Sequence, residues 1–396
     1  MNKINFDQII DRKGTDCLKY DFAVRRGRPA DVLPLWVADM DFAVPKEVTE
    51  ALAKRVQHGI FGYSESGDSY FEAVAGWMWT HHGYEVQPEW LVKTPGVVFA
   101  LAMAVRALTK EEDAVLIQQP VYYPFSEVIR DNGRKLVDSP LVLDEHGHYQ
   151  MDFADLEEKI IENDVRLLLL CSPHNPVGRV WTEEELRTLA DICIRHEVWM
   201  VSDEIHADFV FEGKHHMLAS LGPEIESRTI TCTSASKTFN LAGLQTANIF
   251  IPNPRVRRRF QKEVAAAGYS QLNTLGLVAT EAAYRYGDDW YRQLLGYLRE
   301  NLAFLEAFTE EHLPGIRVIR PEGTYLVWMD FRGLGLTEPE LEHFIVHEAK
   351  LWLDAGAVFG AAGEGFERIN IACPRSTLNQ ALCQLEEARS GLCSGR

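Results

Sequence analysis

The sequence predicts an α/β fold: a large domain with a mainly parallel, seven-stranded sheet covered by helices, plus a smaller α+β domain. Short runs of apolar and β-branched residues recur between residues 91 and 251, each about the length of one strand. Several of these runs are separated by segments with a helical period. Strands this apolar are buried on both faces, which is typical of parallel sheets between helices. After about residue 275 the pattern changes to a long amphipathic helix followed by short strands.

The composition excludes several classes of protein. At 396 residues, 46% of them hydrophobic, the chain is long enough for two domains with a sizeable core. Its net charge of −18 argues against binding nucleic acid or an anionic membrane surface. No apolar run approaches the ~20 residues of a membrane span, and charges near the start replace the apolar segment of a secretory signal. The seven cysteines are scattered without a CxxC pair, which predicts a reduced, cytoplasmic protein.

The N-terminal segment is predicted to be an irregular arm. Its run LPLWVADMDF, at 33–42, alternates apolar and acidic residues, which indicates an extended segment lying on another surface. The expected division is an arm at 1–45 that forms part of the small domain, a large domain at 46–280 and a small domain at 281–396.

The remaining elements are predicted from hydrophobic period and length. Strands of the large sheet are expected at 91–94, 114–118, 134–138, 166–171, 198–203, 228–233 and 247–251. Helices are expected at 45–58, 69–82, 97–109 and 182–197, the last opened by a capping box from Thr182 to Glu185. The small domain is expected to contain helices at 288–311 and 338–349 and strands at 316–319, 325–330 and 367–372.

Functional side chains follow four of the predicted strands, at the place where open α/β sheets bind ligands. Val97 and Val98 begin a helix after the first strand, so their free backbone N–H groups can hold a phosphate. Tyr122 follows the second strand and offers a face for stacking on a ring. Asn175 is held rigidly between two prolines after the fourth strand. Asp203 ends the fifth strand, where a buried carboxylate requires a cationic partner.

A single lysine follows the sixth strand in the turn SASKTFN. Lys237 lies beside Ser234 and Ser236, and desolvation there would lower the pKa of its amine toward nucleophilic use. Taken alone, such a serine-rich turn is usually a solvated loop. One cofactor uses all of these groups together. Pyridoxal 5′-phosphate presents an aldehyde, a ring nitrogen, a phenolic oxygen, a stackable ring and a phosphate.

From about residue 30 to residue 385 the chain resembles fold-type I pyridoxal-phosphate enzymes of the aspartate aminotransferase superfamily. The resemblance implies that Lys237 forms the imine with the cofactor, that Asp203 pairs with the ring nitrogen and that Asn175 binds the ring oxygen. It implies further that the ring stacks on Tyr122 and that the phosphate is held by Val97, Val98, Ser234 and Ser236.

Further positions follow from the same resemblance. Tyr63 is expected to reach the phosphate in a neighbouring subunit, which implies a homodimer with shared active sites. Arg368, in ERINIA, is expected to bind the substrate α-carboxylate through a bidentate pair, with Arg375 as the alternative. The arm is expected to contact the substrate at Ala38, and Asn175 is expected to contact it as well. Catalysis is expected to depend on Lys237, Tyr122 and Asp203.

Two departures from the aminotransferase pattern narrow the subfamily. Gln245 stands where aminotransferases usually have an arginine for the phosphate, and His206 stands where they have a tyrosine. Together with WVADMDF at 36–42 and NIACPRS at 370–376, these residues resemble the MalY/PatB family of cystathionine β-lyases, or cysteine-S-conjugate β-lyases. The resemblance implies α,β-elimination of L-cystathionine or related L-cysteine S-conjugates to pyruvate, ammonia and a thiol. In place of the arginine, His206 is expected to bind the cofactor, donating a hydrogen bond if protonated.

Other functions fit the sequence less well. An aminotransferase would share the cofactor residues and differ in the step after Cα deprotonation. The run SASK at 234–237 fits the SxxK of serine acyl-transfer enzymes, but the accompanying SDN and KTG elements are missing. A non-catalytic sensor of the cofactor would not need both Lys237 and Arg368. Metal binding has the least support, because His343 and His347 lack the glutamate of HExxH and are typical of a surface helix face.

Overall fold

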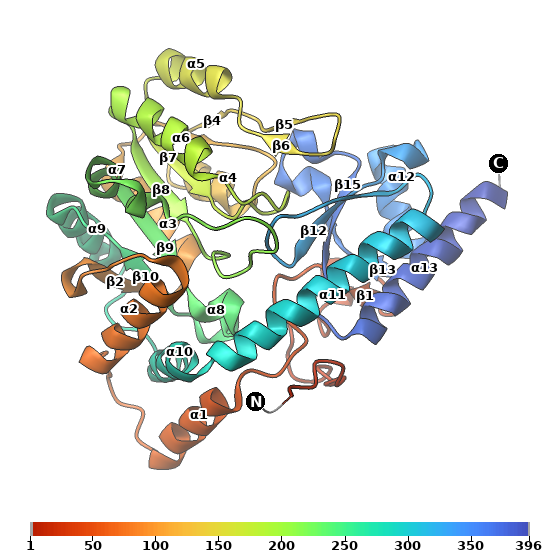
Figure 1. Ribbon diagram of the computed structural model, residues 1–396, viewed down its shortest axis with the longest axis horizontal. Coiled ribbons are helices and arrows are strands. Elements are labelled where there is room, and N and C mark those ends of the chain that lie inside the picture. Colours follow the sequence, from red (N-terminus) through yellow and green to blue (C-terminus); the bar gives the residue numbers. More distant parts are fainter. Residues whose placement is uncertain (1–2, 395–396) are drawn as a thin grey trace.

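The computed structural model describes residues 3–394 and contains a large seven-stranded sheet and a small four-stranded sheet, both packed against helices (Figure 1). The strands of the large sheet are Leu91–Thr94 (β2), Ala114–Ile117 (β3), Lys135–Asp138 (β4), Val165–Cys171 (β7), Trp199–Asp203 (β8), Thr229–Thr233 (β9) and Ala247–Phe250 (β10). Their order is β2-β10-β9-β8-β7-β3-β4, and β10 runs in the opposite direction to the other six strands. The mainly parallel seven-stranded sheet predicted from the sequence is therefore confirmed.

Helices cover both faces of this sheet, as predicted for strands that are apolar throughout. Leu167 and Leu169 of β7 point to one face, and Leu168 and Leu170 point to the other. The first face is covered by Val97–Leu108 (α3), Pro124–Arg130 (α4) and Pro254–Ala266 (α9). The second is covered by Phe153–Asn163 (α5), Glu183–Arg195 (α6) and Pro223–Arg228 (α7). A short hairpin of Val142–Leu143 (β5) and Tyr149–Gln150 (β6) lies beside them.

The small sheet has the order β11-β12-β15-β14 and is antiparallel. Its strands are Arg317–Ile319 (β11), Leu326–Asp330 (β12), Asp354–Ala355 (β14) and Phe366–Asn370 (β15). In Figure 1 the long helix Asp288–His312 (α11) leads from the α10 side of the molecule to this sheet, with Arg375–Ser394 (α13) packed alongside it. The remaining helices are Lys46–His58 (α1), Asp68–His82 (α2), Ala235–Thr238 (α8), Thr274–Tyr286 (α10) and Glu338–His343 (α12).

The N-terminal arm lies against the C-terminal part of the chain. Leu33–Pro34 (β1) pairs in parallel with Leu351–Trp352 (β13). The Asn370 amide donates hydrogen bonds of 2.6 Å to the carbonyls of Val37 and Asp39. The arm is therefore fixed to the small sheet by backbone and side-chain hydrogen bonds.

Most predicted elements are confirmed to within a few residues, including the capping box at Thr182. The helix predicted at 338–349 is α12 followed by a π-helical turn at Phe344–Glu348. The helices α4, α5, α7, α10 and α13 and the hairpin β5-β6 were not predicted. Of these, α4, α7, β5 and β6 are too short to show a repeated pattern. The predicted domain boundary at 280/281 falls inside α10, so the division into domains stays a prediction. Among residues 3–394, no helix combines the length and apolarity needed to cross a membrane.

Candidate active site

A cavity of about 400 Å³ lies where β2, β3, β7, β8 and β9 end at one edge of the large sheet. Its walls come from the segments that follow these strands and from the arm. The cavity brings together ten of the residues predicted from the sequence: Ala38, Val97, Val98, Tyr122, Asn175, Asp203, His206, Ser234, Ser236 and Lys237.

Lys237 lies in α8, a single helical turn between β9 and β10. Ser234 caps this turn by accepting a hydrogen bond of 3.0 Å from the Ser236 backbone N–H. The Lys237 amine donates to the carbonyl of Ala38 at 2.8 Å. Burial lowers the pKa of this amine from 10.5 to about 8, and the positive charge of Arg368 acts in the same direction. About one tenth of the amine is therefore neutral, and nucleophilic, at pH 7, far more than for a solvated lysine.

Asp203 is the last residue of β8 and is 5% exposed. Its Oδ1 accepts a hydrogen bond of 3.1 Å from the backbone N–H of Ile205. Burial raises the pKa of the carboxyl to about 7, against the opposing effects of the Ile205 hydrogen bond and the Lys237 charge. A carboxylate in this setting gains from a cation placed beside it in the cavity.

Asn175 and Arg368 meet at the small-domain side of the cavity. The guanidinium of Arg368 donates to Asn175 Oδ1 at 3.0 Å and to the Trp36 carbonyl at 2.8 Å, and it pairs with Asp354. The Asn175 oxygen is thus used, which leaves its amide N–H₂ to face a ligand. Arg375 instead donates to Asn301 on α11 at 2.8 Å. The structure therefore favours Arg368 over Arg375 as the arginine next to the cavity.

The expected phosphate-binding end of the cavity is formed by α3 and α8. Val97 and Val98 are the first residues of the 12-residue helix α3, whose initial N–H groups have no partner within the helix. The hydroxyl of Ser234 differs from the expectation, because it donates to the Thr246 carbonyl at 2.6 Å. Its hydrogen is therefore not available to a phosphate. Gln245 also lines the cavity and adds no positive charge there.

His206 lines the cavity, and its surroundings disfavour a positive charge on the ring. The ring is buried, and its Nδ1 has no hydrogen-bond partner among the described residues. Burial lowers the pKa of the imidazole well below 6.5, and the charges of Lys237 and Arg368 lower it further. Both effects favour the neutral ring, which can still donate a hydrogen bond through one N–H. The expected contact of His206 with the cofactor stays a prediction.

Sequence reasoning missed Tyr325. Its hydroxyl donates to the Ala38 carbonyl at 3.0 Å, so this carbonyl accepts hydrogen bonds from both Tyr325 and Lys237. The side chain is fully buried against Phe209, with ring centroids 4.8 Å apart. Tyr325 precedes β12 in a run that is apolar throughout, so nothing in the pattern distinguished it from a core residue.

Tyr63 is not in the cavity. Its side chain is 97% exposed and lies beside Tyr269 and Leu272 in a separate open hollow. Within one chain it makes no contribution to the groups around Lys237. Its expected role in a neighbouring subunit stays a prediction.

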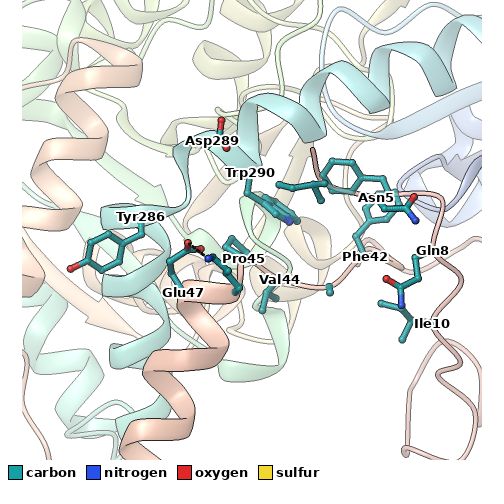
Figure 2. Close-up of a pocket in the computed structure, with 14 residues that line it drawn as sticks. Asn5, Gln8, Ile10, Phe42, Val44, Pro45, Glu47, Tyr286, Asp289 and Trp290 are labelled. Carbon is teal, nitrogen blue, oxygen red and sulfur yellow. Dashed lines mark ion pairs between the residues drawn. The ribbon is translucent and has the colours of Figure 1, made fainter. Parts of the chain in front are cut away.

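Figure 2 shows a second cavity, of about 320 Å³, between the arm, the segment that leads into α1 and the start of α11. Phe6, Phe42 and Trp290 line it, and Phe6 makes edge-to-face contacts with the other two rings. Neither Lys237 nor Asp203 lines it. The contact between Phe6 and Trp290 joins the arm to α11. This second cavity is separate from the Lys237 cavity.

Comparison with known proteins agrees with this geometry. Residues 30–385 match the family described as aminotransferase class I and II. The chain belongs to this family. Within the class I and II aminotransferases, it is 42% identical to the cystathionine β-lyase PatB of Bacillus subtilis (strain 168), over 98% of this chain and all of PatB. It is 33% identical to protein MalY of Escherichia coli (strain K12), over 97% of this chain and 98% of MalY.

Solved structures of the family show the same fold. Cystalysin from Treponema denticola, which contains pyridoxal 5′-phosphate, superposes with a TM-score of 0.94 at 38% identity, covering 98% of this chain and 99% of cystalysin. A PLP-bound C–S lyase from Staphylococcus hominis gives a TM-score of 0.90 at 35% identity, covering 97% and 98% of the two chains. The fold is therefore that of fold-type I enzymes, and the cofactor of this family member is pyridoxal 5′-phosphate.

The residues of this chain fit that cofactor. The cavity contains an amine of lowered pKa, a buried carboxyl, a free amide N–H₂ and the ring of Tyr122. A helix N-terminus lies in the same cavity, so each functional group of the cofactor has a chemically matched side chain or backbone group. The unpartnered His206 Nδ1 is a further polar atom for which a ligand would supply a partner.

Proposed function

We propose that this family member is a PLP-dependent carbon–sulfur β-lyase that cleaves L-cystathionine or related L-cysteine S-conjugates to pyruvate, ammonia and a thiol. The observation that carries the proposal is the meeting of Lys237 and Asp203 in one cavity, with pKa values shifted toward each other. The 42% identity to a cystathionine β-lyase over 98% of the chain supports the same activity.

Each residue has a distinct task in this proposal. The bound cofactor supplies an aldehyde that captures the substrate amine and a cationic ring that accepts the electron pair left at Cα. Lys237 takes the Cα proton onto its neutral Nζ as general base. Asp203 keeps the positive charge at the ring nitrogen, Asn175 donates its amide N–H to the ring oxygen, and Tyr122 stacks on the ring. His206 contacts the cofactor as a neutral ring, and the N–H groups of Val97 and Val98 hold the phosphate with Ser236.

The β-elimination step requires little acid catalysis. Breaking the Cβ–S bond releases a thiolate, and a thiol pKa of about 8.5 makes thiolate a far better leaving group than an alkoxide. The Lys237 ammonium formed in the first step is a proton source within the cavity. The enamine released from the enzyme is hydrolysed by one water molecule to pyruvate and ammonia.

Arg368 is the proposed site for the substrate α-carboxylate. Its side chain is 2% exposed, and its Nε is buried without a partner among the described residues. The pairing with Asp354 and Asn175 fixes the guanidinium plane while leaving this donor for a ligand. The Ala38 carbonyl, which holds the Lys237 amine, lies on the arm segment that contacts Arg368 through Trp36.

Turnover on a panel of cysteine thioethers tests the proposal. Purified holoenzyme should release pyruvate from L-cystathionine or an S-alkylcysteine in equal amount to the thiol, and Lys237→Ala should abolish this release. The same samples are assayed for amino transfer to 2-oxoglutarate. Amino transfer without pyruvate release would reject the lyase in favour of an aminotransferase.

The proposal includes a cytoplasmic homodimer. Its basis is exposed apolar surface: Ile60 is 65% exposed, Phe61 58% and Tyr63 97%, all in the segment between α1 and α2. Several large apolar side chains exposed within one short segment are typical of an interface. In such a dimer Tyr63 would contact the phosphate in the partner's cavity. The scattered cysteines are consistent with a reducing compartment.

A further inference from the structure

We infer that Asp208 and Thr238 are positioning residues, which hold the Lys237 turn and the Asp203 loop in fixed relation to each other. The inference rests on the proposed function and adds to it a buried contact behind the cavity. Neither residue lines the cavity, and neither touches the groups assigned to the chemistry above.

Thr238 is the residue after Lys237 in α8, and its hydroxyl donates to Asp208 Oδ2. Asp208 follows Asp203 and His206 in the loop after β8. This loop is itself rigid, because Ala207 N–H donates to the Glu204 carbonyl at 3.0 Å and Phe209 N–H donates to the His206 carbonyl at 2.9 Å. One hydrogen bond between side chains therefore joins the turn α8, which carries the amine, to the loop that directly follows Asp203.

The acceptor in this contact, Asp208, is also held by two side chains of α2. Asp208 Oδ1 accepts hydrogen bonds from Trp77 Nε1 at 3.0 Å and His82 Nε2 at 2.9 Å, both on α2. Burial alone would raise the pKa of Asp208, but the hydrogen bond and charge of His82 and the hydrogen bonds from Thr238 and Trp77 lower it from its usual value of 3.8. Asp208 is thus a buried carboxylate with three donors.

Through Thr238, this arrangement connects the position of Lys237 to Asp208. The turn is held at its start by Ser234, whose hydroxyl donates to Thr246, and after its end by Asn240, whose amide donates to the Met40 and Phe42 carbonyls. Thr238 supplies the one side-chain hydrogen bond directed toward the Asp203 loop among these contacts. Without it, the Lys237 turn and the segment after Asp203 are joined, in the described part of the chain, only through the backbone pairing of β8 with β9, in which the Glu204 N–H donates to the Cys232 carbonyl at 2.9 Å. Proton transfer is sensitive to misplacement of this kind.

A purely structural role for Asp208 makes a different prediction. If Asp208 served only to pack α2, the bonds from Trp77 and His82 would suffice, and removing the Thr238 hydroxyl would lower stability without altering the chemistry. The matched variants are Thr238→Val, which removes the hydroxyl at nearly constant volume, and Thr238→Ser, which retains it. Thr309→Val is the control, because Thr309 is buried in α11 and its hydroxyl has no partner among the described residues.

The test measures kcat, KM and the visible absorbance of the holoenzyme as a function of pH. Thr238→Val should lower kcat about tenfold with KM within about twofold, and should shift the midpoint of the absorbance titration. Thr238→Ser should restore both values, and Thr309→Val should leave both unchanged. If valine prevents folding, Thr238→Ala removes the same hydroxyl.

A Thr238→Val enzyme with wild-type kcat and titration midpoint, or one that loses only thermal stability, would overturn the inference. Failure of serine to restore the values would also overturn it. A wild-type protein that binds the cofactor without pyruvate release would reject the proposed function instead, and the absorbance titration would still report on Thr238.

Discussion

At the scale of single residues, burial away from water shifts the pKa values of Lys237 and Asp203 in opposite directions. Burial disfavours the charged form of each group, so it lowers the pKa of the amine to about 8 and raises that of the carboxyl to about 7. The two values end close together and near physiological pH. Strongly shifted pKa values of two groups in one cavity are typical of sites that perform acid–base chemistry.

The lowered pKa of Lys237 predicts how cofactor capture depends on pH. Only the neutral amine attacks an aldehyde, so the capture rate of the apoenzyme should rise about tenfold per pH unit below the pKa of about 8 and level off above it. Stopped-flow absorbance after mixing with pyridoxal 5′-phosphate measures this rate, and Lys237→Arg should show no capture. A rate still rising steeply above pH 9 would show that the amine is not desolvated.

Asp203 should be needed for its charge rather than its shape. Asp203→Asn keeps the size and the Ile205 hydrogen bond but cannot hold a proton or a cation at the ring nitrogen, so kcat should fall about a hundredfold. Because the change removes a buried carboxyl, thermal stability should not fall in parallel. Steady-state kinetics and thermal unfolding of the same samples separate the two effects. An Asn variant with kcat within twofold of wild type would exclude the proposed role.

Several site residues could be predicted from their position at the ends of strands, whereas Arg368, Ala38 and Tyr63 were predicted from the family resemblance. Asn175, Asp203 and Lys237 each come after an apolar run, and the ends of parallel strands meet at one edge of a sheet. Tyr325 and Asp354 reach the site from the small domain, and their positions depend on how two sheets pack. The donation of the Ser234 hydroxyl to Thr246 depends on the return path of the chain, which the local sequence does not specify.

At the scale of elements, the arm is fixed by buried charges. Asp41 accepts from Lys19 Nζ and from Arg12, both at 2.7 Å, and Arg12 also pairs with Asp39 at 2.6 Å. Lys19 is fully buried, so its ammonium depends on this carboxylate for solvation. The acidic residues predicted from the alternating run at 33–42 thus face cations from the preceding segment of the same chain.

Removing the buried cation should destabilise the protein measurably. Lys19→Met keeps the length of the side chain but leaves Asp41 with Arg12 as its remaining cationic partner, which should cost about 2 kcal/mol of unfolding free energy. Urea denaturation with an unchanged m-value measures the loss. In the control Lys159→Met, which removes a partly exposed pair at 4.0 Å, the change should stay within about 0.5 kcal/mol. Equal losses in both variants would contradict a special role for burial.

The reversed strand β10 explains how the Lys237 turn is held, and the sequence did not predict its direction. Residues 234–246 link β9 to β10 with no crossover helix long enough to return the chain to the start of the sheet, so β10 must run antiparallel. An apolar run of four residues looks the same in either direction. The Lys237 turn is consequently held at both ends by paired strands, β9 before it and β10 after it.

Gly178, which follows β7 of the large sheet, lies close to Pro321, between β11 and β12 of the small sheet. Its φ is 76°, and a Cβ atom there would lie 2.4 Å from Cβ of Pro321. Gly178→Ala should therefore destabilise the protein by about 2–4 kcal/mol and displace the neighbouring Asn175. Thermal unfolding measures the first effect, and the dissociation rate of the cofactor measures the second. Gly213→Ala is the control for positive φ alone, because φ is 74° and nothing lies within 4 Å.

At the scale of the whole molecule, the position of Tyr63 predicts complementation between subunits. If each site uses Lys237 from one chain and Tyr63 from the other, mixing Lys237→Ala with Tyr63→Ala should restore activity in hybrid dimers, in which one of the two sites is intact. Random reassortment then gives about one quarter of the wild-type activity. Each variant alone should be nearly inactive.

Analytical ultracentrifugation identifies the hybrids in that experiment through a size tag on one variant. The control is a mixture of wild type with a double variant that carries both Lys237→Ala and Tyr63→Ala. Its activity should not exceed that of the wild-type chains it contains, because no hybrid dimer then has an intact site. Hybrids that form without recovering activity, or a wild-type chain that sediments as a monomer, would reject the shared site.

The pairing of the arm with the C-terminal strands has a consequence for synthesis on the ribosome. The arm segment up to Asp41 is synthesised first, whereas its partners between Lys350 and Ala372 are synthesised some 300 residues later. At ordinary elongation rates this delay is about 15–60 s. During that interval the nascent chain has every cofactor-facing strand end but lacks the surface on which its arm rests. Translation arrested before residue 350 should leave the arm open to proteolysis, and release of the finished chain should protect it. Protection already present in the arrested chain would show that the arm docks elsewhere.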